Sequence, residues 1–156
     1  MLPGSRFAEK LRHKYYNDHA VDPDTNQERV VARPKIEVAF RKNSSIKDPE
    51  TNPEIRVYGL VDSGADMTII PLSFAQLLGY NNWNSQEIEN SSGAEGGLIP
   101  YFIRNADITI GDIKIRIQIA CSLLDNVPFL LGRKDIFDKF QVCFNDKEKK
   151  IKFTEL

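Results

Sequence analysis

Short stretches in which every second residue is apolar recur along this chain. Ile36, Val38 and Phe40 form one such stretch, and the alternation predicts a half-buried strand. The clearest case is the segment 108–119, where isoleucine occupies every second position on either side of a Gly111-Asp112 pair. A two-residue Gly-Asp connection between alternating stretches predicts a β-hairpin. The pattern thus indicates a chain built from short strands.

Other strands are predicted where apolar or β-branched residues cluster between turn residues. They are the segments 55–61, 68–70, 129–131, 141–144 and 150–153. Helical spacing of apolar residues occurs over 74–78, behind Pro71 and with Gly79 as C-terminal cap, and again over 136–140. Many short strands with only short helices predict an all-β domain, either a small closed barrel or a sandwich.

The N-terminal fifth of the chain is different, because residues 1–33 show no clear core face. Apolar residues at four-residue spacing between 7 and 15, with a basic opposite face, predict a solvated helix, a flexible arm or a docking element for a partner. The segment 17–26 is rich in turn residues and is interpreted as a linker. We therefore expect an N-terminal extension over residues 1–33 and a globular domain over residues 34–156.

Length, composition and net charge limit the number of domains and the classes of binding partner to expect. The chain has 156 residues, of which 41% are hydrophobic and 28% are charged, as expected for one domain with its own core. The formal net charge of −1 implies no strong attraction to nucleic acid or to anionic lipid. No apolar stretch is long enough for a membrane span, and no signal peptide is visible. We expect a cytoplasmic protein without nucleic-acid or membrane partners.

Metal and cofactor chemistry has little support in the residue pattern. Cys121 and Cys143 lack metal-ligand spacing and need not pair with each other. The two histidines of the sequence, His13 and His19, lie in the poorly patterned N-terminal segment, which offers no framework for a zinc site or a histidine-based triad. We therefore expect neither a metal site nor a cofactor.

One predicted turn has unusual surroundings. The strand 55–61 stops at Asp62-Ser63-Gly64, residue types that favour tight turns, so a plain surface turn is one interpretation. However, the apolar residues Leu60-Val61 before the turn and the segment 68–70 behind it would partly withdraw the Asp62 carboxylate from water. In such surroundings a second carboxylate close by would share one proton with the first. The other interpretation is therefore a turn that carries a catalytic carboxylate.

The segment Asp62-Ser63-Gly64-Ala65-Asp66 resembles the active-site motif of the retropepsins, the aspartic proteases of retroviruses and their cellular relatives. Leu130-Leu131-Gly132-Arg133 is similar to the second hallmark of that family, although Lys134 is inserted before the acid Asp135. A glycine-rich stretch over 93–99 lies between the motifs, where the family has its flap. The resemblance covers about residues 34–153. It implies the acid protease fold, a small closed β-barrel with one short C-terminal helix that functions as a homodimer.

The resemblance implies that Asp62 is the catalytic residue. Only one Asp-Ser-Gly or Asp-Thr-Gly occurs in the chain, whereas two-lobed pepsin-like enzymes carry two, so the second carboxylate must come from another chain. A symmetric homodimer is the simplest source. One carboxylate would take a proton from the water that attacks the peptide carbonyl, and the protonated one would polarise the carbonyl oxygen.

The same resemblance assigns supporting roles around Asp62. Ser63 would connect the active-site loops of the two subunits, Gly64 would let the loop pass close to the carboxylates, and Asp66 with Arg133 would brace the loop. The expected substrate-binding positions lie in the active-site loop and the flap; they are Ala65, Asp66, Gly93, Gly96, Gly97 and Leu98. The glycine-rich stretch on its own is also compatible with a flexible surface hairpin.

The leading hypothesis is an aspartic endopeptidase that acts on polypeptides as a homodimer. The N-terminal extension and the long loop over 43–54 depart from the viral pattern and indicate a cellular or prokaryotic relative. A second hypothesis is a retropepsin-fold dimer that binds extended peptides without cutting them. A third is a domain tethered to another protein by its basic N-terminal arm, with proteolysis confined to self-processing.

Overall fold

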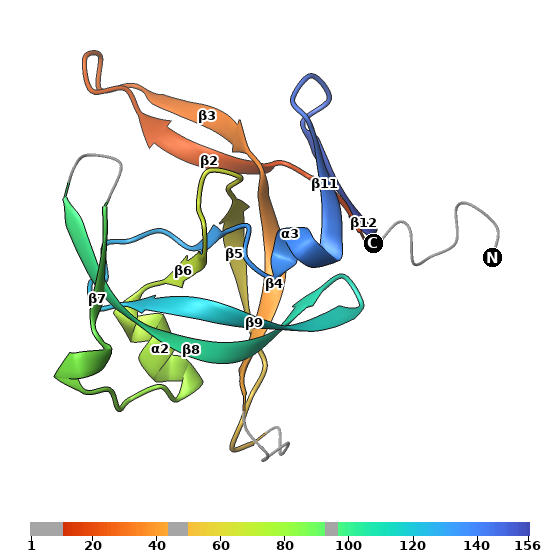
Figure 1. Ribbon diagram of the computed structural model, residues 1–156. Coiled ribbons are helices and arrows are strands. Elements are labelled where there is room, and N and C mark those ends of the chain that lie inside the picture. Colours follow the sequence, from red (N-terminus) through yellow and green to blue (C-terminus); the bar gives the residue numbers. More distant parts are fainter. Residues whose placement is uncertain (1–10, 44–49, 93–96) are drawn as a thin grey trace.

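The computed structural model describes residues 11–43, 50–92 and 97–156, most of them in strands (Figure 1). The strands are β1 (Arg12–Lys14), β2 (Tyr16–Val21), β3 (Glu28–Arg33), β4 (Lys35–Lys42), β5 (Ile55–Val61), β6 (Thr68–Ile70), β7 (Glu89–Ser92), β8 (Leu98–Ile110), β9 (Ile113–Ser122), β10 (Leu130–Leu131), β11 (Phe140–Asn145) and β12 (Lys150–Glu155). The helices are α2 (Leu72–Leu78), the 3₁₀ helix η1 (Ser85–Glu87) and α3 (Ile136–Lys139).

Six strands close into a barrel. Neighbours in the sheet follow the order β4, β5, β10, β6, β9, β8, and β4 also pairs with β8, which joins the two ends. Closure gives every barrel strand a partner on both sides over part of its length, an arrangement that protects a small sheet from pairing with other chains. Strand β7 adds to the far part of β8 and extends the sheet beyond the barrel. The predicted all-β class and closed barrel are confirmed.

Alternation along the strands fills the barrel with apolar side chains. Phe40, Phe102, Ile108, Ile117 and Ile119 are all buried, and each belongs to the inward-facing set of its strand. The half-buried Trp83 stacks on the buried Phe102, with ring centroids 4.8 Å apart. Trp83, which lies in the segment before η1, therefore packs on the core.

The helices are short and follow the expected signals. Helix α2 begins after Pro71 and ends at Gly79, whose φ of 107° lies in the left-handed region that glycine tolerates. Helix α3 has four residues and connects the barrel to the last two strands. No helix in the described ranges is both long and apolar enough to cross a membrane.

A separate three-stranded sheet brings the two ends of the chain together, with the order β1, β12, β11. Arg12 lies opposite Lys152 in this sheet, so residues 12–14 form a strand and the helix predicted over 7–15 is wrong there. The strand forms because β12, about 140 residues away in the sequence, offers backbone partners that local helical propensity does not take into account. Residues 7–10 of that prediction lie outside the described residues.

The segment interpreted as a linker is a β-hairpin. Strands β2 and β3 pair antiparallel from Tyr16 opposite Arg33 to Val21 opposite Glu28, and form a two-stranded sheet of their own. The turn is held by the Asp22 carboxylate, which accepts hydrogen bonds from the backbone N–H groups of Asp24 and Thr25. The turn residues were recognised in the sequence, but the strands that flank them were not.

Removal of the buried Phe102 ring tests this packing. Phe102→Ala should lower the free energy of unfolding by about 3–5 kcal/mol, because a buried ring is lost and its site cannot collapse. Urea unfolding followed by the fluorescence of Trp83, the one tryptophan of the chain, measures it. The control Leu77→Ala, at a side chain 64% exposed on α2, should stay within about 0.5 kcal/mol of wild type. Equal losses in the two variants would contradict the assigned core.

Candidate active site

The Asp62 turn lies at one end of the barrel, where β5 ends (Figure 1). The backbone N–H of Asp62 donates to the Leu131 carbonyl at 3.0 Å, which fixes the start of the turn against β10. The Gly64 N–H donates to the Asp62 carboxylate oxygen Oδ1 at 2.8 Å, and the Ala65 N–H donates to the Asp62 carbonyl at 3.2 Å. The Asp62 side chain is half-buried and is oriented by the turn that follows it.

Strand β10 holds both sides of this turn. It lies between β5, with which it runs parallel, and β6, with which it runs antiparallel. Beyond β10 the Arg133 N–H donates to the Ala65 carbonyl and the Lys134 N–H donates to the Asp66 carbonyl, both at 2.9 Å. Strand β10 therefore pairs with the strands that flank the turn, and the segment after β10 pairs with the turn itself.

Gly132 lets the two segments approach closely. A Cβ atom at this position would lie 2.3 Å from the backbone carbon and oxygen of Met67 and 2.9 Å from the Ala65 carbonyl oxygen. The Gly132 N–H donates to the hydroxyl of the buried Thr68 at 3.2 Å. Sequence reasoning missed Thr68, since a threonine in an apolar strand gives no sign of its hydrogen-bond partner.

Asp66 and Arg133 form an ion pair across the same junction. The Arg133 Nη2 atom lies 2.7 Å from Asp66 Oδ1. The Arg133 side chain is 57% exposed and the Asp66 side chain is 86% exposed. An ion pair so exposed contributes little to stability. Its geometric effect is to connect the end of the Asp62 turn to the segment after β10.

The inserted Lys134 is accommodated by a change in backbone direction. Asp135 has a φ of 67°, a region that non-glycine residues rarely adopt, and its carboxylate accepts a hydrogen bond from the Gln118 N–H at 2.8 Å. The acid after the Gly-Arg pair thus contacts strand β9, whereas Arg133 contacts the Asp62 turn. No pattern in the sequence indicated this contact to β9.

The remaining predicted site residues lie at the same end of the barrel or outside the described ranges. Strands β7 and β8 form an antiparallel hairpin that reaches this end, and Ser92 lies opposite Leu98 at its outermost pair (Figure 1). Gly97 and Leu98 are exposed, as is Ser63 in the turn. The predicted positions Gly93 and Gly96 lie outside the described residues.

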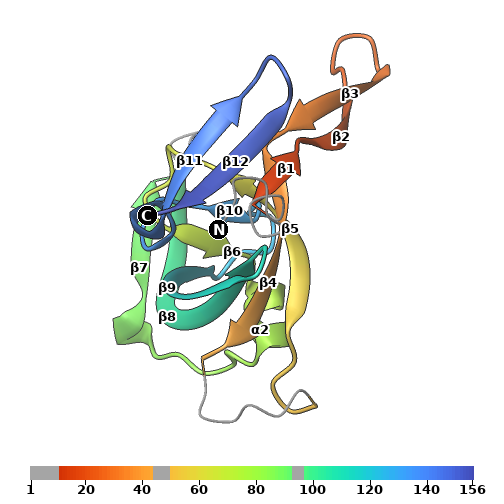
Figure 2. The same cartoon turned by 90° about the vertical axis from the view of Figure 1, so that its right-hand side faces the viewer.

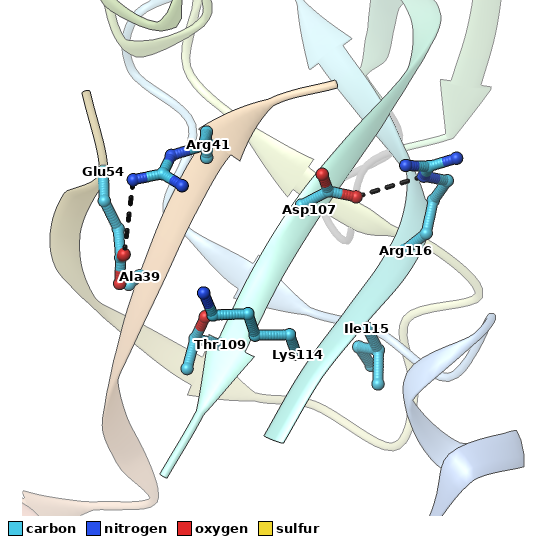
Figure 3. Close-up of a pocket in the computed structure, with 8 residues that line it drawn as sticks. All are labelled: Ala39, Arg41, Glu54, Asp107, Thr109, Lys114, Ile115 and Arg116. Carbon is cyan, nitrogen blue, oxygen red and sulfur yellow. Dashed lines mark hydrogen bonds and ion pairs between the residues drawn. The ribbon is translucent and has the colours of Figure 1, made fainter. Parts of the chain in front are cut away.

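A cavity of about 380 Å³ lies on the outer surface of the barrel (Figure 3), and Asp62 is not among the residues that line it. Four of its charged lining side chains form two ion pairs: Arg116 lies 3.1 Å from Asp107, and Arg41 lies 3.8 Å from Glu54. These side chains come from β4, β8, β9 and the residue before β5, and none belongs to the predicted site.

Comparison with known proteins gives a family and a fold. The profile of the family described as "Aspartyl protease" matches residues 50–134, a range that contains both the Asp62 turn and Arg133. A retropepsin-like aspartic protease from Rickettsia conorii has a similar structure, with a TM-score of 0.52 and 16% sequence identity over 92% of this chain and 98% of that chain. No curated protein sequence matches.

A further similar structure is the EIAV protease complexed with the inhibitor HBY-793, with a TM-score of 0.49 and 19% identity over 76% of this chain and 93% of that chain.

Because the family profile covers more than half of the residues, the chain belongs to the aspartyl protease family. Its fold is that of the retropepsin-like aspartic proteases.

The close approach at Gly132 can be tested with a matched pair of glycine substitutions. Gly132→Ala should lower the free energy of unfolding by at least about 2 kcal/mol, because the added methyl group meets backbone that cannot move aside. Gly97→Ala should be almost neutral, since a methyl group there would meet no described atom within 4 Å beyond its chain neighbours. Thermal and urea unfolding of both variants measure the difference. A neutral Gly132→Ala would contradict the described junction.

Proposed function

We propose that this protein is an aspartic endopeptidase in which two Asp62 carboxylates, one from each subunit of a homodimer, hydrolyse peptide bonds. The observation that carries the proposal is the Asp62 turn, which β10 and the Arg133–Lys134 segment hold by backbone hydrogen bonds. Membership of the aspartyl protease family supports the same function.

The homodimer follows from the number of motifs. The sequence contains one Asp-Ser-Gly and no Asp-Thr-Gly, so a single chain supplies one carboxylate of the pair. A two-fold axis beside Asp62 would bring the same turn of a second copy against the first. In that arrangement the exposed Ser63 is positioned to connect the two turns, and Gly64 keeps the backbone close to the carboxylates.

The chemistry requires one proton shared between the two carboxylates. Side by side, they cannot both ionise at low cost, so one remains protonated. The ionised carboxylate accepts a proton from water as the water oxygen attacks the peptide carbonyl, while the protonated one donates a hydrogen bond to the carbonyl oxygen. Transfer of a proton to the amide nitrogen then lets the carbon–nitrogen bond break. The proposal needs neither a metal nor a cofactor.

Substrate binding is assigned to the Asp62 turn and to the hairpin of β7 and β8, which we propose as the flap. Both lie at the same end of the barrel (Figure 1). An extended polypeptide between them would bond with backbone groups at a hairpin edge. The proposed contact positions are Ala65, Asp66, Gly93, Gly96, Gly97 and Leu98. We assign the protease domain to residues 34–156 and an N-terminal extension to residues 1–33.

Replacing the catalytic carboxylate is the first test. Asp62→Asn should lower kcat/KM for peptide cleavage by at least about 100-fold, because the amide cannot accept a proton from water. A peptide library incubated with purified protein between about pH 3 and pH 8 identifies a substrate, and dimerisation should persist in the variant. Stable dimers with no cleavage by the wild type would instead favour the peptide-binding module.

Loss of the ion pair between Asp66 and Arg133 should affect activity much more than stability. Arg133→Met should change the free energy of unfolding by less than about 1 kcal/mol because both side chains are exposed. It should lower kcat by about tenfold or more, because the Asp62 turn loses a connection that fixes its position. Arg56→Met removes a similar exposed pair with Glu37, at 2.8 Å on the barrel surface, and should leave kcat unchanged. Equal kcat values for Arg133→Met and wild type would contradict the bracing role.

A further inference from the structure

We propose that the hairpin formed by β2 and β3, called the arm below (residues 16–33), binds a second copy of this chain and holds the two Asp62 turns together. The proposal rests on the proposed function, because it supplies the surface that a shared active site requires. It assigns a role to a part of the extension for which the sequence indicated only a linker.

The arm projects from the barrel end that carries the candidate site. In Figure 1 and in the perpendicular view of Figure 2, the arm rises from the same end as the connection between β5 and β6 and the outer part of the β7–β8 hairpin. The hairpin of β11 and β12 rises there as well. A second copy that presents its own Asp62 at this end would therefore lie against the arm.

One face of the arm carries exposed apolar side chains. Residues directly opposite in an antiparallel pair share a face, so His19 with Val30 and Val21 with Glu28 lie on one side. Val21 and Val30 are diagonal neighbours on this face, and they are 57% and 59% exposed. Two β-branched apolar side chains left largely in water on a projecting hairpin indicate a contact surface.

The arm is attached to the rest of the chain only near its base, among the described residues. Tyr16 packs on Tyr58 of β5 with ring centroids 4.7 Å apart, and Asp18 pairs with Lys35 of β4 at 2.8 Å. Next to the base, the Tyr15 N–H donates to the Lys149 carbonyl at 2.8 Å. Beyond these contacts, β2 and β3 pair with no further strand in the described ranges, and an isolated two-stranded hairpin is marginally stable in water.

Charge complementarity favours a second copy as the occupant. The outer arm, residues 21–30, has three acidic residues and one basic residue, a net charge of −2. The outer hairpin of β11 and β12, residues 145–152, has four lysines and two acidic residues, a net charge of +2. A two-fold contact uses the same surface twice, so it must be self-complementary, and opposite charges on two segments at one end of the molecule meet that requirement.

The test measures dimerisation of the full-length chain directly. Val21→Asp/Val30→Asp should raise the dimer dissociation constant, measured by sedimentation equilibrium, at least about 100-fold, because four valines lose their apolar contact in a symmetric dimer. The protein concentration that gives half-maximal cleavage activity should rise by the same factor. Activity at saturating concentration should stay within about twofold of wild type, because the Asp62 turn is unaltered.

Two further variants make the result specific. Val21→Thr/Val30→Thr keeps the β-branched shape that suits a strand and should raise the dissociation constant about tenfold; it decides the matter if the aspartate variant does not fold. Leu77→Asp places one such charge at a similarly exposed apolar side chain on α2, and should leave the dissociation constant unchanged.

Different outcomes separate the arm from the proposed function. A wild-type dimer whose dissociation constant is unchanged in both valine variants would overturn the role of the arm, whatever the activity. A wild-type chain that stays monomeric at all concentrations would overturn the arm and the shared active site together. A dimer that depends on the valines but cuts no peptide would keep the arm and reject the peptidase.

Discussion

The position of strand β10 is the constraint on which the candidate site depends. Only two residues long, it lies between β5 and β6, and so it occupies the space that the Asp62 turn spans. The hydrogen bond from Asp62 N–H to Leu131 and the one from Arg133 N–H to Ala65 can form together only because Gly132 has no side chain to hold the segments apart. The course of the Asp62 turn and the position of Arg133 beside it are thus consequences of one junction.

Most of the barrel could be predicted from the sequence because its strands are half-buried, and burial of one face produces the alternation that pattern reasoning detects. The hairpin of β8 and β9 is the clearest example, with its run of isoleucines. Strands β1, β2, β3 and β7 were not predicted, and β1 and the arm show two different physical reasons. Strand β1 depends on β12, a partner at the other end of the chain. The arm exposes much of both faces, so it lacks alternation, although its turn was recognised.

The site was predictable to a similar extent. Motif resemblance located Asp62 and Arg133, and the structure brings their segments together, with Asp66 as the partner of Arg133. It did not locate Thr68 or the contact between Asp135 and Gln118, because both depend on where β6 and β9 lie in three dimensions. The insertion of Lys134 shows what motif spacing alone could not predict. A change in spacing of one residue is absorbed by the unusual backbone angle at Asp135, and Arg133 still reaches the turn.

A site divided between two copies makes activity depend on an association equilibrium. In the proposed dimer, each chain contributes one carboxylate, so the free energy of subunit binding decides how much complete active site exists at a given concentration. Barrel closure covers part of the sheet edges that would otherwise serve as contacts, so segments outside the barrel become the more available contact surfaces. The arm, with two exposed valines and an acidic tip, offers a small surface. In the proposed dimer, a contact of that size makes assembly responsive to concentration and to ionic strength.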